Sequence, residues 1–599
     1  MTKKTLLALA VVASLVGWGE LSVPAAAHTV LQGAVKSADG VSLDGVVVSA
    51  RQNGKTFTTS VFTDERGNYV FPRLPGGSYR VWAQAVGFET ARAELEMAEG
   101  TRVAEKDFTL NTLADFSKQL SGSEWIASLP EATPADKRMK LLFRNNCSGC
   151  HTPNFVLQNR FDEAGWRKII DVMETVGIYG NPPSPDRAPQ PLIRQYKDEL
   201  AAYLAKMRGP GPSPIQFKTY PRPRGEAARV VITEYDYPSS ADTSKYVTHD
   251  GSDWMEGVPS AYEARGSHDA EVDADGFVWI ADSQDNRVRT VARLDPSTGE
   301  IRNFKFDGQY GMAQGSHGIV IDQKGRAWFN ADNGLGMIDT KTLQMERFTP
   351  PQGMAGVGGT LDVDANGVVC ASSTTGALRF NPATKKFTEF ISKSPGRQGR
   401  TYGAAMDSRG NCWWAQMNYD KLGVGDGRTG EVTEVALEPV RGVDALLTDR
   451  DRKLFQEFGS DWNSATLFQQ APRRLSGDKQ GNVWVANWWG NNLAKIDAST
   501  HQVTHYNYPQ AGHFPGIYDT VVDKNGMVWM NLMNTDRVAR FDPATERWTE
   551  FQLPTLGTET RFVAVDNHKA QVEVWVPYWR THKLARIQFR TAEQLRAQR

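Results

Sequence analysis

The sequence predicts a multidomain, mainly β protein made of a β-sandwich, a small all-α domain and a seven-bladed β-propeller. Three observations lead to this fold class: short strands separated by turn signals near the N-terminus, helical periodicity around a Cys-x-x-Cys-His motif, and a repeat of about 45 residues over the C-terminal three-fifths. With 599 residues the chain is too long for a single core. Its net charge of −1 gives no reason to expect a nucleic-acid partner.

Residues 1–27 are predicted to be a secretory signal peptide. Lys3 and Lys4 precede an apolar run over residues 6–16, and small residues follow at 25–27. The alternative is an uncleaved membrane anchor, for which the apolar run is short. The signal predicts an exported, periplasmic protein. No later stretch is long enough to span a bilayer, so we expect no transmembrane span in the mature chain.

Residues 28–112 alternate short apolar strands with turns. Six strands are expected, over residues 30–35, 46–51, 57–62, 67–71, 79–85 and 91–97. The stretches GAVKSADGVSLDGVVVSA and TDERGNYVFPRLPGGSYRVWAQAVGF resemble the carboxypeptidase regulatory-like domain, which implies a transthyretin-type sandwich with an accessory role. We find no cluster of titratable residues here that would indicate chemistry of its own.

Cys147, Cys150 and His151 form the Cys-x-x-Cys-His motif, at the end of a helix predicted over residues 134–146. Two thiols at this spacing can add to the two vinyl groups of a haem, and the histidine that follows can ligate the iron. The alternative is a redox disulfide pair, which would require a thioredoxin-like βαβ context that is missing here. We therefore expect one covalent haem c. The remaining cysteines, Cys370 and Cys412, are too few for a disulfide framework.

Two more helices are predicted after the motif. In residues 161–177, Trp166, Ile169, Ile170 and Met173 recur at helical spacing, and residues 192–207 form a second amphipathic run. Three helices around the motif resemble a small monohaem cytochrome c domain, which we place at residues 115–212.

The sixth iron ligand in such a domain is often a methionine, because a thioether favours reduced iron. Met173 is our candidate, since Trp166 to Met173 is similar to a helix found in some cytochromes c. Met139 and Met207 are alternatives. Met173 could instead be a core methionine, with histidine or nothing at the sixth position.

Seven repeat units follow within residues 229–590, each with an apolar strand, an Asp, a Gly-containing turn and an aromatic strand. The anchoring aromatic falls at Trp279, Trp328, Trp413, Trp484, Trp529 and Trp575, with Cys370 in its place in the third unit. The spacings are 49, 42, 43, 71, 45 and 46 residues, which is about one four-stranded blade each, with an insert of roughly 25 residues near 437–470. Residues 230–238 match a fourth strand that precedes the first unit, so they are expected to complete the last blade and close the ring.

The repeats resemble the streptogramin (virginiamycin B) lyase family. In that family a His stands five residues before the repeat Asp and a Glu stands fourteen after the His, and together they hold a metal ion and perform acid–base work. The first position here reads His268, His317, Gly359, Tyr402, Arg473, Tyr518 and Arg561. Only the first unit keeps an acid at the second position, Asp282.

The missing Glu argues against lyase chemistry. The first-position residues are nevertheless polar in six units and should line the central channel, where they could hold an anion or a divalent metal. His268, Asp282 and His317 are therefore the candidate catalytic residues of the channel. The alternative is a wet channel whose mouth is simply polar.

Together these features predict an exported c-type cytochrome that transfers electrons through one haem, with a propeller that binds a small-molecule substrate or a redox partner protein. Two alternatives stay open. One is an enzyme of the propeller channel, either lyase-like or a haem-linked dehydrogenase. The other is an envelope scaffold or binding protein.

Overall fold

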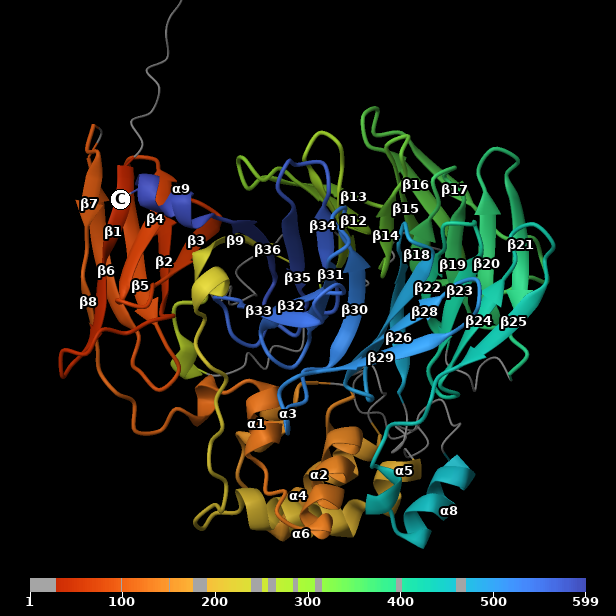
Figure 1. Cartoon of the computed structure of the whole chain (residues 1–599), viewed down its shortest axis with the longest axis horizontal. Coiled ribbons are helices and arrows are strands. Elements are labelled where there is room, and N and C mark those ends of the chain that lie inside the picture. Colours follow the sequence, from red (N-terminus) through yellow and green to blue (C-terminus); the bar gives the residue numbers. More distant parts are fainter. Residues whose placement is uncertain are drawn as a thin grey trace, which may run out of the picture.

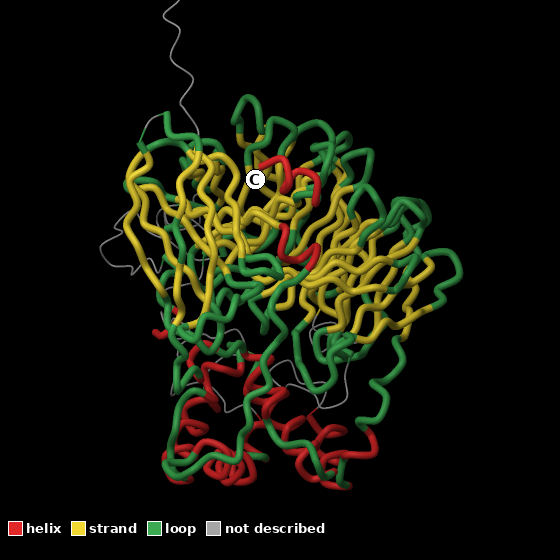
Figure 2. Tube along the Cα trace, turned by 60° about the vertical axis from the view of Figure 1, so that its left-hand side comes forward, coloured by secondary structure: helices red, strands yellow, loops and turns green. Residues whose placement is uncertain are grey.

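The computed structural model describes residues 29–98, 100–149, 151–175, 191–238, 250–256, 266–283, 289–306, 315–394, 401–458 and 470–598. The predicted signal peptide, residues 1–27, lies outside these ranges. A sandwich and a set of four-stranded sheets stand side by side, and most of the helices gather below the sheets (Figures 1 and 2). Among the described residues, no helix is both long and apolar enough to cross a membrane.

The N-terminal domain is a β-sandwich, as predicted. One sheet contains β1 (Thr29–Ser37), β4 (Asn68–Leu74), β7 (Val103–Glu105) and β8 (Phe108–Leu110), and the other contains β2 (Val47–Gln52), β3 (Phe57–Phe62), β5 (Gly77–Gln84) and β6 (Ala91–Met97). All six predicted strands are present. The sequence missed β7 and β8 because each has only three residues; both pair in parallel with β1.

The sandwich is joined to the rest of the chain by backbone pairing. Strand β9 (Val230–Asp236) pairs antiparallel with β3 on one side and with β36 (Lys583–Phe589) on the other. One eight-stranded sheet therefore runs from the last blade into the sandwich. This pairing confirms that residues 230–238 complete the last blade, and it covers an edge that would otherwise be open.

Six further sheets each contain four antiparallel strands in chain order. They are β10–β13 (Ser267–Val272, Val278–Asp282, Val291–Leu294, Ile301–Phe304), β14–β17 (Ile319–Ile321, Arg326–Ala331, Gly334–Asp339, Met345–Phe348), β18–β21 (Val357–Val363, Val369–Ser373, Gly376–Asn381, Lys386–Ile391), β22–β25 (Thr401–Met406, Cys412–Gln416, Lys421–Gly425, Val432–Ala436), β26–β29 (Pro472–Gly477, Asn482–Asn487, Asn492–Asp497, Val503–Asn507) and β30–β33 (Ile517–Val522, Val528–Leu532, Arg537–Asp542, Arg547–Gln552). The seventh contains β34 (Ala564–Asp566), β35 (Glu573–Tyr578), β36 and β9.

The seven sheets are propeller-like blades arranged in a closed cycle. The first strand of each sheet contacts the first strand of the next, from β10 through β14, β18, β22, β26 and β30 to β34, and β34 contacts β10 again. These first strands line the centre of the ring, as the repeat pattern predicts.

A repeated hydrogen bond explains the Asp-turn-Gly-aromatic pattern of the blades. In the first blade the indole Nε1 of Trp279 donates to Asp273 at 2.8 Å, while the other carboxylate oxygen accepts backbone N–H groups of the turn. The same indole–carboxylate bond joins Trp328 to Asp322, Trp413 to Asp407, Trp484 to Asp478 and Trp529 to Asp523. Each Asp thus fixes both the turn and the buried aromatic of its blade.

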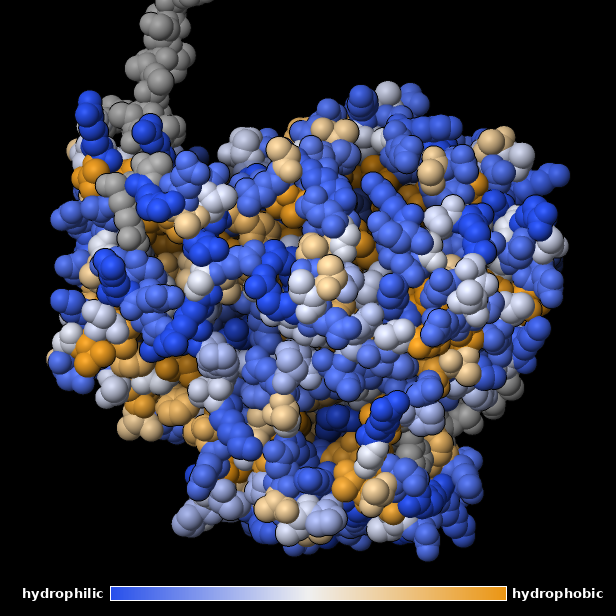
Figure 3. Space-filling model, viewed as in Figure 1, coloured by the Kyte–Doolittle hydropathy of each residue, from blue (hydrophilic) through white to orange (hydrophobic). Residues whose placement is uncertain are grey.

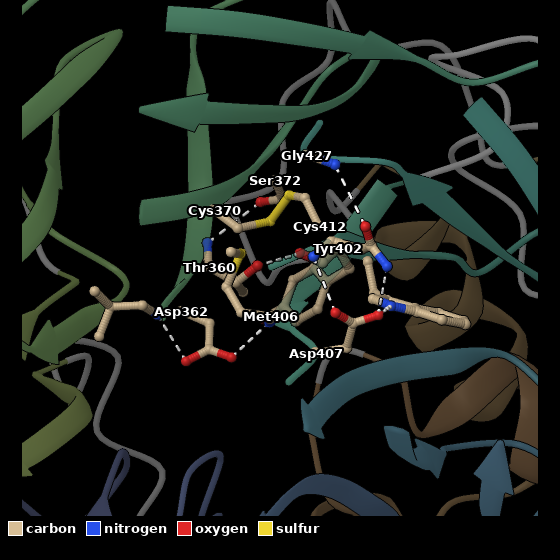
Figure 4. The surroundings of a disulfide bond; sticks show 12 residues. Thr360, Asp362, Cys370, Ser372, Tyr402, Met406, Asp407, Cys412 and Gly427 are labelled. Atoms are coloured by element: carbon tan, nitrogen blue, oxygen red, sulfur yellow. Dashed lines mark hydrogen bonds between the residues drawn. A yellow bond between two sulfur atoms is a disulfide. The ribbon is translucent and has the colours of Figure 1, made fainter. Parts of the chain in front are cut away.

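The third blade replaces this indole with a thiol. Cys370 forms a disulfide with Cys412 of the fourth blade, with the two Cα atoms 5.7 Å apart (Figure 4). From the sequence alone, these two cysteines were considered too few for a disulfide framework. Their separation of 42 residues equals one repeat, which is the signal that could have paired them.

The helical body contains α1 (Gly122–Ser128), α2 (Pro134–Cys147), α3 (Pro153–Leu157), α4 (Glu163–Glu174), α5 (Pro191–Gln195) and α6 (Lys197–Arg208). The three predicted helices correspond to α2, to α4 and to α5 with α6, which separate at Tyr196. Helix α2 begins sharply because Thr133 and Asp136 form a capping box around Pro134. The sequence missed the short helices α1 and α3.

The helical body and the ring share one apolar core. Trp125, Phe143 and Leu204 of the helices belong to the same buried cluster as Trp488 and Phe514 of the ring. Apolar side chains are visible where the two parts meet (Figure 3). The helices are therefore packed against the ring through buried side chains.

The insert after the fourth blade forms helix α8 (Asp449–Phe458), which contacts α5. Asp451 of α8 is fully buried and accepts two hydrogen bonds of 2.7 Å from Arg138 of α2 and one of 2.8 Å from the hydroxyl of Tyr196. The insert therefore clamps the helical body onto the ring. The remaining elements are short: η1 (Ser117–Gln119), η2 (Gly225–Arg229), η4 (Trp254–Glu256), η5 (Asp444–Leu446) and α9 (Ala592–Gln598), which packs on β4.

Candidate haem site and channel mouth

The Cys-x-x-Cys-His motif lies where α2 ends. Cys147 is the last residue of α2 and packs, partly buried, against the core shared with the ring. Cys150 lies outside the described residues. The helix, its cap and the core therefore fix the position of the first thiol.

His151 lies within electrostatic range of the ring. Its imidazole is tilted against Phe155, with the ring centroids 5.2 Å apart, and its Nδ1 lies 3.3 Å from the carbonyl oxygen of Thr152. Burial lowers the pKa of His151, the charge of Arg580 lowers it further, and Glu559 acts in the opposite direction. Since Glu559 and Arg580 belong to the last blade, the motif stands next to the ring. A neutral imidazole is the form that ligates a metal.

The surroundings of Arg144 bear on whether a haem suits this part of the chain. Its guanidinium lies one turn before Cys147 on α2, 4.8 Å from the ring centroid of Phe514, and Nε donates to Asn145 at 3.1 Å. Burial lowers the pKa of Arg144 to about 10. In the described part of the chain no carboxylate pairs with this cation. An acidic group such as a haem propionate fits there.

The three candidate methionines differ in their surroundings. Met173 is partly buried near the end of α4 and packs against the shared core. The sulfur of Met139 accepts a hydrogen bond from Arg138 at 3.7 Å, and Met207 is 1% exposed within the core. Among the described contacts, the sulfur of Met173 makes no hydrogen bond, and its side chain is only partly buried. Met173 therefore remains the predicted sixth ligand.

The first-position residues of the blades meet at one end of the channel. The rings of His268 and His317 lie 3.6 Å apart between centroids. The hydroxyl of Tyr402 lies 2.9 Å from Nε2 of His317 and forms a short hydrogen bond with the hydroxyl of Tyr518. Arg473 lies over the ring of Tyr518 at 3.9 Å. Five blades therefore contribute to one buried network, which we call the channel mouth.

Two residues that the sequence did not single out complete this network. Asp269 lies 2.7 Å from Nδ1 of His268 and accepts two hydrogen bonds, of 2.8 and 2.9 Å, from Arg474. Each follows a first-position residue, and in a regular strand it would point to the opposite face. The register shifts at the start of β10 and β26, between Ser267 and Ala270 and between Pro472 and Leu475, so two consecutive side chains reach the channel mouth.

Asp282 lies apart from the two histidines. It accepts a hydrogen bond of 2.6 Å from Arg289 and one of 3.3 Å from the hydroxyl of Tyr237. Among the described residues, the group with metal-ligand spacing is His268, Asp269 and His317, whose ligand atoms lie within 4.8 Å of one another. Asp269 therefore replaces Asp282 as the candidate acid beside the two histidines.

The charges around this group favour an anion over a divalent metal. Arg474 already occupies both oxygens of Asp269. Burial lowers the pKa of His268 well below its usual value, and the neighbouring Arg474, Arg561 and Arg473 lower it further. A cation would have to displace Arg474 and approach two more guanidiniums, so the residues present fit a divalent metal poorly.

Comparisons with known proteins agree with parts of this description. Residues 30–111 match the family model of the carboxypeptidase regulatory-like domain. Among solved structures, the chain is similar to a streptogramin B lyase, with 18% identity over 54% of this chain and 94% of that one and a TM-score of 0.43. It is also similar to virginiamycin B lyase from Staphylococcus aureus, with 13% identity over 60% of this chain and 99% of that one and a TM-score of 0.44. No curated protein matches the chain. The closed ring is established by the strand pairing and the contacts between first strands within this chain.

Proposed function

We propose that this protein is an exported c-type cytochrome whose ring binds a small-molecule substrate or a redox partner next to the haem. Cys147 and Cys150 attach one haem, His151 ligates its iron, and Met173 supplies the sixth ligand. The observation that carries the proposal is the position of His151, at the end of α2 and within reach of the charges of Glu559 and Arg580 on the last blade. The bound haem would supply one-electron exchange.

The residues of the chain prepare this site in three ways. The neutral imidazole of His151 is ready to ligate iron, and its contact with the carbonyl of Thr152 orients the ring. The guanidinium of Arg144 offers a partner to a propionate. The apolar core shared by α2, α6 and the ring keeps water away from the motif.

The Cys370–Cys412 disulfide supports export. Disulfides persist in oxidising compartments such as the periplasm and are rare in the cytosol. Maturation of a haem c also takes place outside the cytoplasm, so both features fit one location.

A second candidate function is a haem-linked dehydrogenase whose reaction takes place at the channel mouth. The observation that favours it is the chain of hydrogen bonds from Tyr518 through Tyr402 to His317. Although burial opposes it, the guanidiniums of Arg473, Arg561 and Arg474 lower the pKa of Tyr518. A buried phenol with a lowered pKa and a hydrogen-bonded path for its proton suits acid–base work.

The primary proposal is tested on protein exported from a host that matures c-type cytochromes. We expect the intact mass to exceed that of the polypeptide by one haem, and the reduced-minus-oxidised spectrum to contain a c-type α-band. The double substitution Cys147→Ala with Cys150→Ala should give a colourless protein that keeps its β-rich circular dichroism. A wild-type mass equal to that of the bare polypeptide would refute the proposal.

A further inference from the structure

Two consecutive arginines at the channel mouth differ in their partners. Arg474 forms a bidentate ion pair with Asp269. Arg473 is 6% exposed and has no carboxylate or hydrogen-bond partner among the described residues. Its guanidinium carbon instead lies 3.9, 4.4 and 4.8 Å from the ring centroids of Tyr518, Trp488 and Tyr402.

An unpaired guanidinium is costly at this position. Its three cation–π contacts offset part of the hydration that the buried guanidinium loses, but none of them supplies a negative charge. The other guanidiniums nearby each have a carboxylate partner: Arg561 and Arg580 share Glu559, at 2.6 and 2.7 Å. Asp519 next to Tyr518 accepts a backbone hydrogen bond from Val563, and burial raises its pKa to about 7. The channel mouth therefore lacks an anion beside Arg473.

His268 adds a second unsatisfied atom. A carboxylate only accepts hydrogen bonds, so Nδ1 of His268 donates to Asp269, and Nε2 of the neutral ring is then an acceptor. This Nε2 is buried and has no hydrogen-bond partner in the described ranges. Arg473 and His268 flank the same ring, that of Tyr518, at 3.9 and 6.3 Å from its centroid. Both unsatisfied groups therefore lie beside one phenol ring.

A cavity shares one residue, Tyr402, with the channel mouth. It has a volume of about 540 Å³ and is lined by Tyr402 and by small residues of the third and fourth blades, Gly358–Thr360, Ser372–Thr374 and Thr401. Tyr402 is also in ring contact with Arg473. A volume of this size suits a small organic ligand.

We propose that the channel mouth binds a small hydroxycarboxylic acid, whose carboxylate pairs with Arg473 and whose hydroxyl group donates to Nε2 of His268. This deepens the proposed function, because it names the substrate class of the ring, and it rests on that function only for the role of the haem. The carboxylate supplies the anion that Arg473 lacks, and the hydroxyl supplies the donor that His268 lacks. Arg474 and Asp269 hold His268 in the orientation that presents Nε2.

The test compares three probes by isothermal titration calorimetry on the full-length protein: mandelate, phenylacetate without the hydroxyl, and 1-phenylethanol without the carboxylate. Wild type should bind mandelate at least tenfold more tightly than either of the others, since each lost hydrogen bond to a buried group costs about 1–3 kcal/mol. Arg473→Gln should weaken mandelate and phenylacetate alike by tenfold or more, and Arg473→Lys should restore part of the affinity. His268→Leu should lower mandelate to the level of phenylacetate and leave phenylacetate unchanged.

Arg347→Gln, which removes an arginine paired with Asp332 in the second blade, is the matched control and should change nothing at this site. Equal affinities of wild type for the three probes, or mandelate binding that survives Arg473→Gln, would overturn the proposal. A haem propionate is the other possible source of a carboxylate. In that case no probe binds and Arg473→Gln shifts the haem potential, which also overturns binding of a free acid. A protein without haem that still binds mandelate would refute the cytochrome proposal and leave this site standing.

Discussion

The β-sandwich and the helical body are attached to the same ring by different kinds of contact. The sandwich is joined by backbone pairing between β3 and β9, in the register Phe57 to Tyr235 through Ser60 to Ile232. The helical body is joined by side chains, through the shared apolar core and the clamp at Asp451. Backbone pairing is possible only at a strand edge, so it holds the sandwich at the outside of the last blade. Side-chain docking can use any surface, and here it places the Cys-x-x-Cys-His motif beside the ring.

The largest effect on this comparison is expected from Asp451→Ala. The substitution removes the partner of the Tyr196 hydroxyl and one of the two carboxylates that pair with the mostly buried Arg138, whose other partner is Glu199. Breaking a buried ion pair costs about 3–5 kcal/mol. We expect the helical body to loosen before the ring unfolds. Urea unfolding followed by both haem absorbance and tryptophan fluorescence measures the difference.

Asp444→Ala is the matched control, because Asp444 lies in the same insert and pairs with Arg452 while its side chain is 79% exposed. An exposed pair is worth at most about 1 kcal/mol. Equal losses from the two substitutions would contradict a clamp at Asp451.

Acid should release the helical body before it releases the sandwich. Although burial opposes it, hydrogen bonds from Arg138, Thr448 and Tyr196 hold the pKa of Asp451 below its usual value. A lowered pKa contributes stability that is fully present above the unfolded pKa, about 3.9, and is lost as the pH falls below it. Limited proteolysis between pH 6 and pH 2 should therefore cut the helical body progressively below about pH 4. An unchanged cleavage pattern for Asp451→Asn and wild type at every pH would show that another group controls the release.

A smaller effect is expected at the sandwich junction. Asp236, at the end of β9, pairs with Arg51 of the sandwich and with the buried Lys583 of the last blade, at 2.6 and 2.7 Å. Asp236→Ala should loosen the attachment of the sandwich less than Asp451→Ala loosens the helical body, because the backbone pairing of β3 with β9 persists. The control is Asp253→Ala, whose partner Arg92 lies 3.8 Å away and is exposed. A loss larger than that at Asp451 would reverse the comparison.

The smallest change in stability, and the sharpest change in spectrum, is expected from Met173→Ala. Loss of the thioether should abolish the weak far-red sulfur-to-iron absorption while the haem stays attached. Met345→Ala, which removes an exposed methionine from β17, is the control. Retention of the band in Met173→Ala would move the ligand to Met139, Met207 or a residue of the ring.

The parts of the fold that follow from local patterns could be predicted from sequence. The repeat Asp and Trp reveal the blades because a hydrogen bond joins them within each unit, as between Asp523 and Trp529. The closing strand at residues 230–238 was predictable because it matches the fourth strand of a unit but precedes the first unit. What could not be predicted depends on contacts between distant segments: β3 with β9, Asp451 with Arg138, and Cys370 with Cys412.

The candidate site also contains residues that could be predicted from sequence and residues that could not. Cys147, His151, His268 and His317 were predicted from motif spacing, and the structure brings the two ring histidines into contact. Asp269 and Arg474 were missed because a register shift at the start of the inner strands turns two consecutive residues toward the channel. No period of two or 3.6 residues in the sequence reports such a shift.

The central claim is that a haem iron sits on His151, next to the ring. Anomalous scattering at the iron edge from crystals of the exported protein tests it most directly. One strong peak is expected within bonding distance of Nε2 of His151. An absent peak, or an iron bound away from His151, would contradict it.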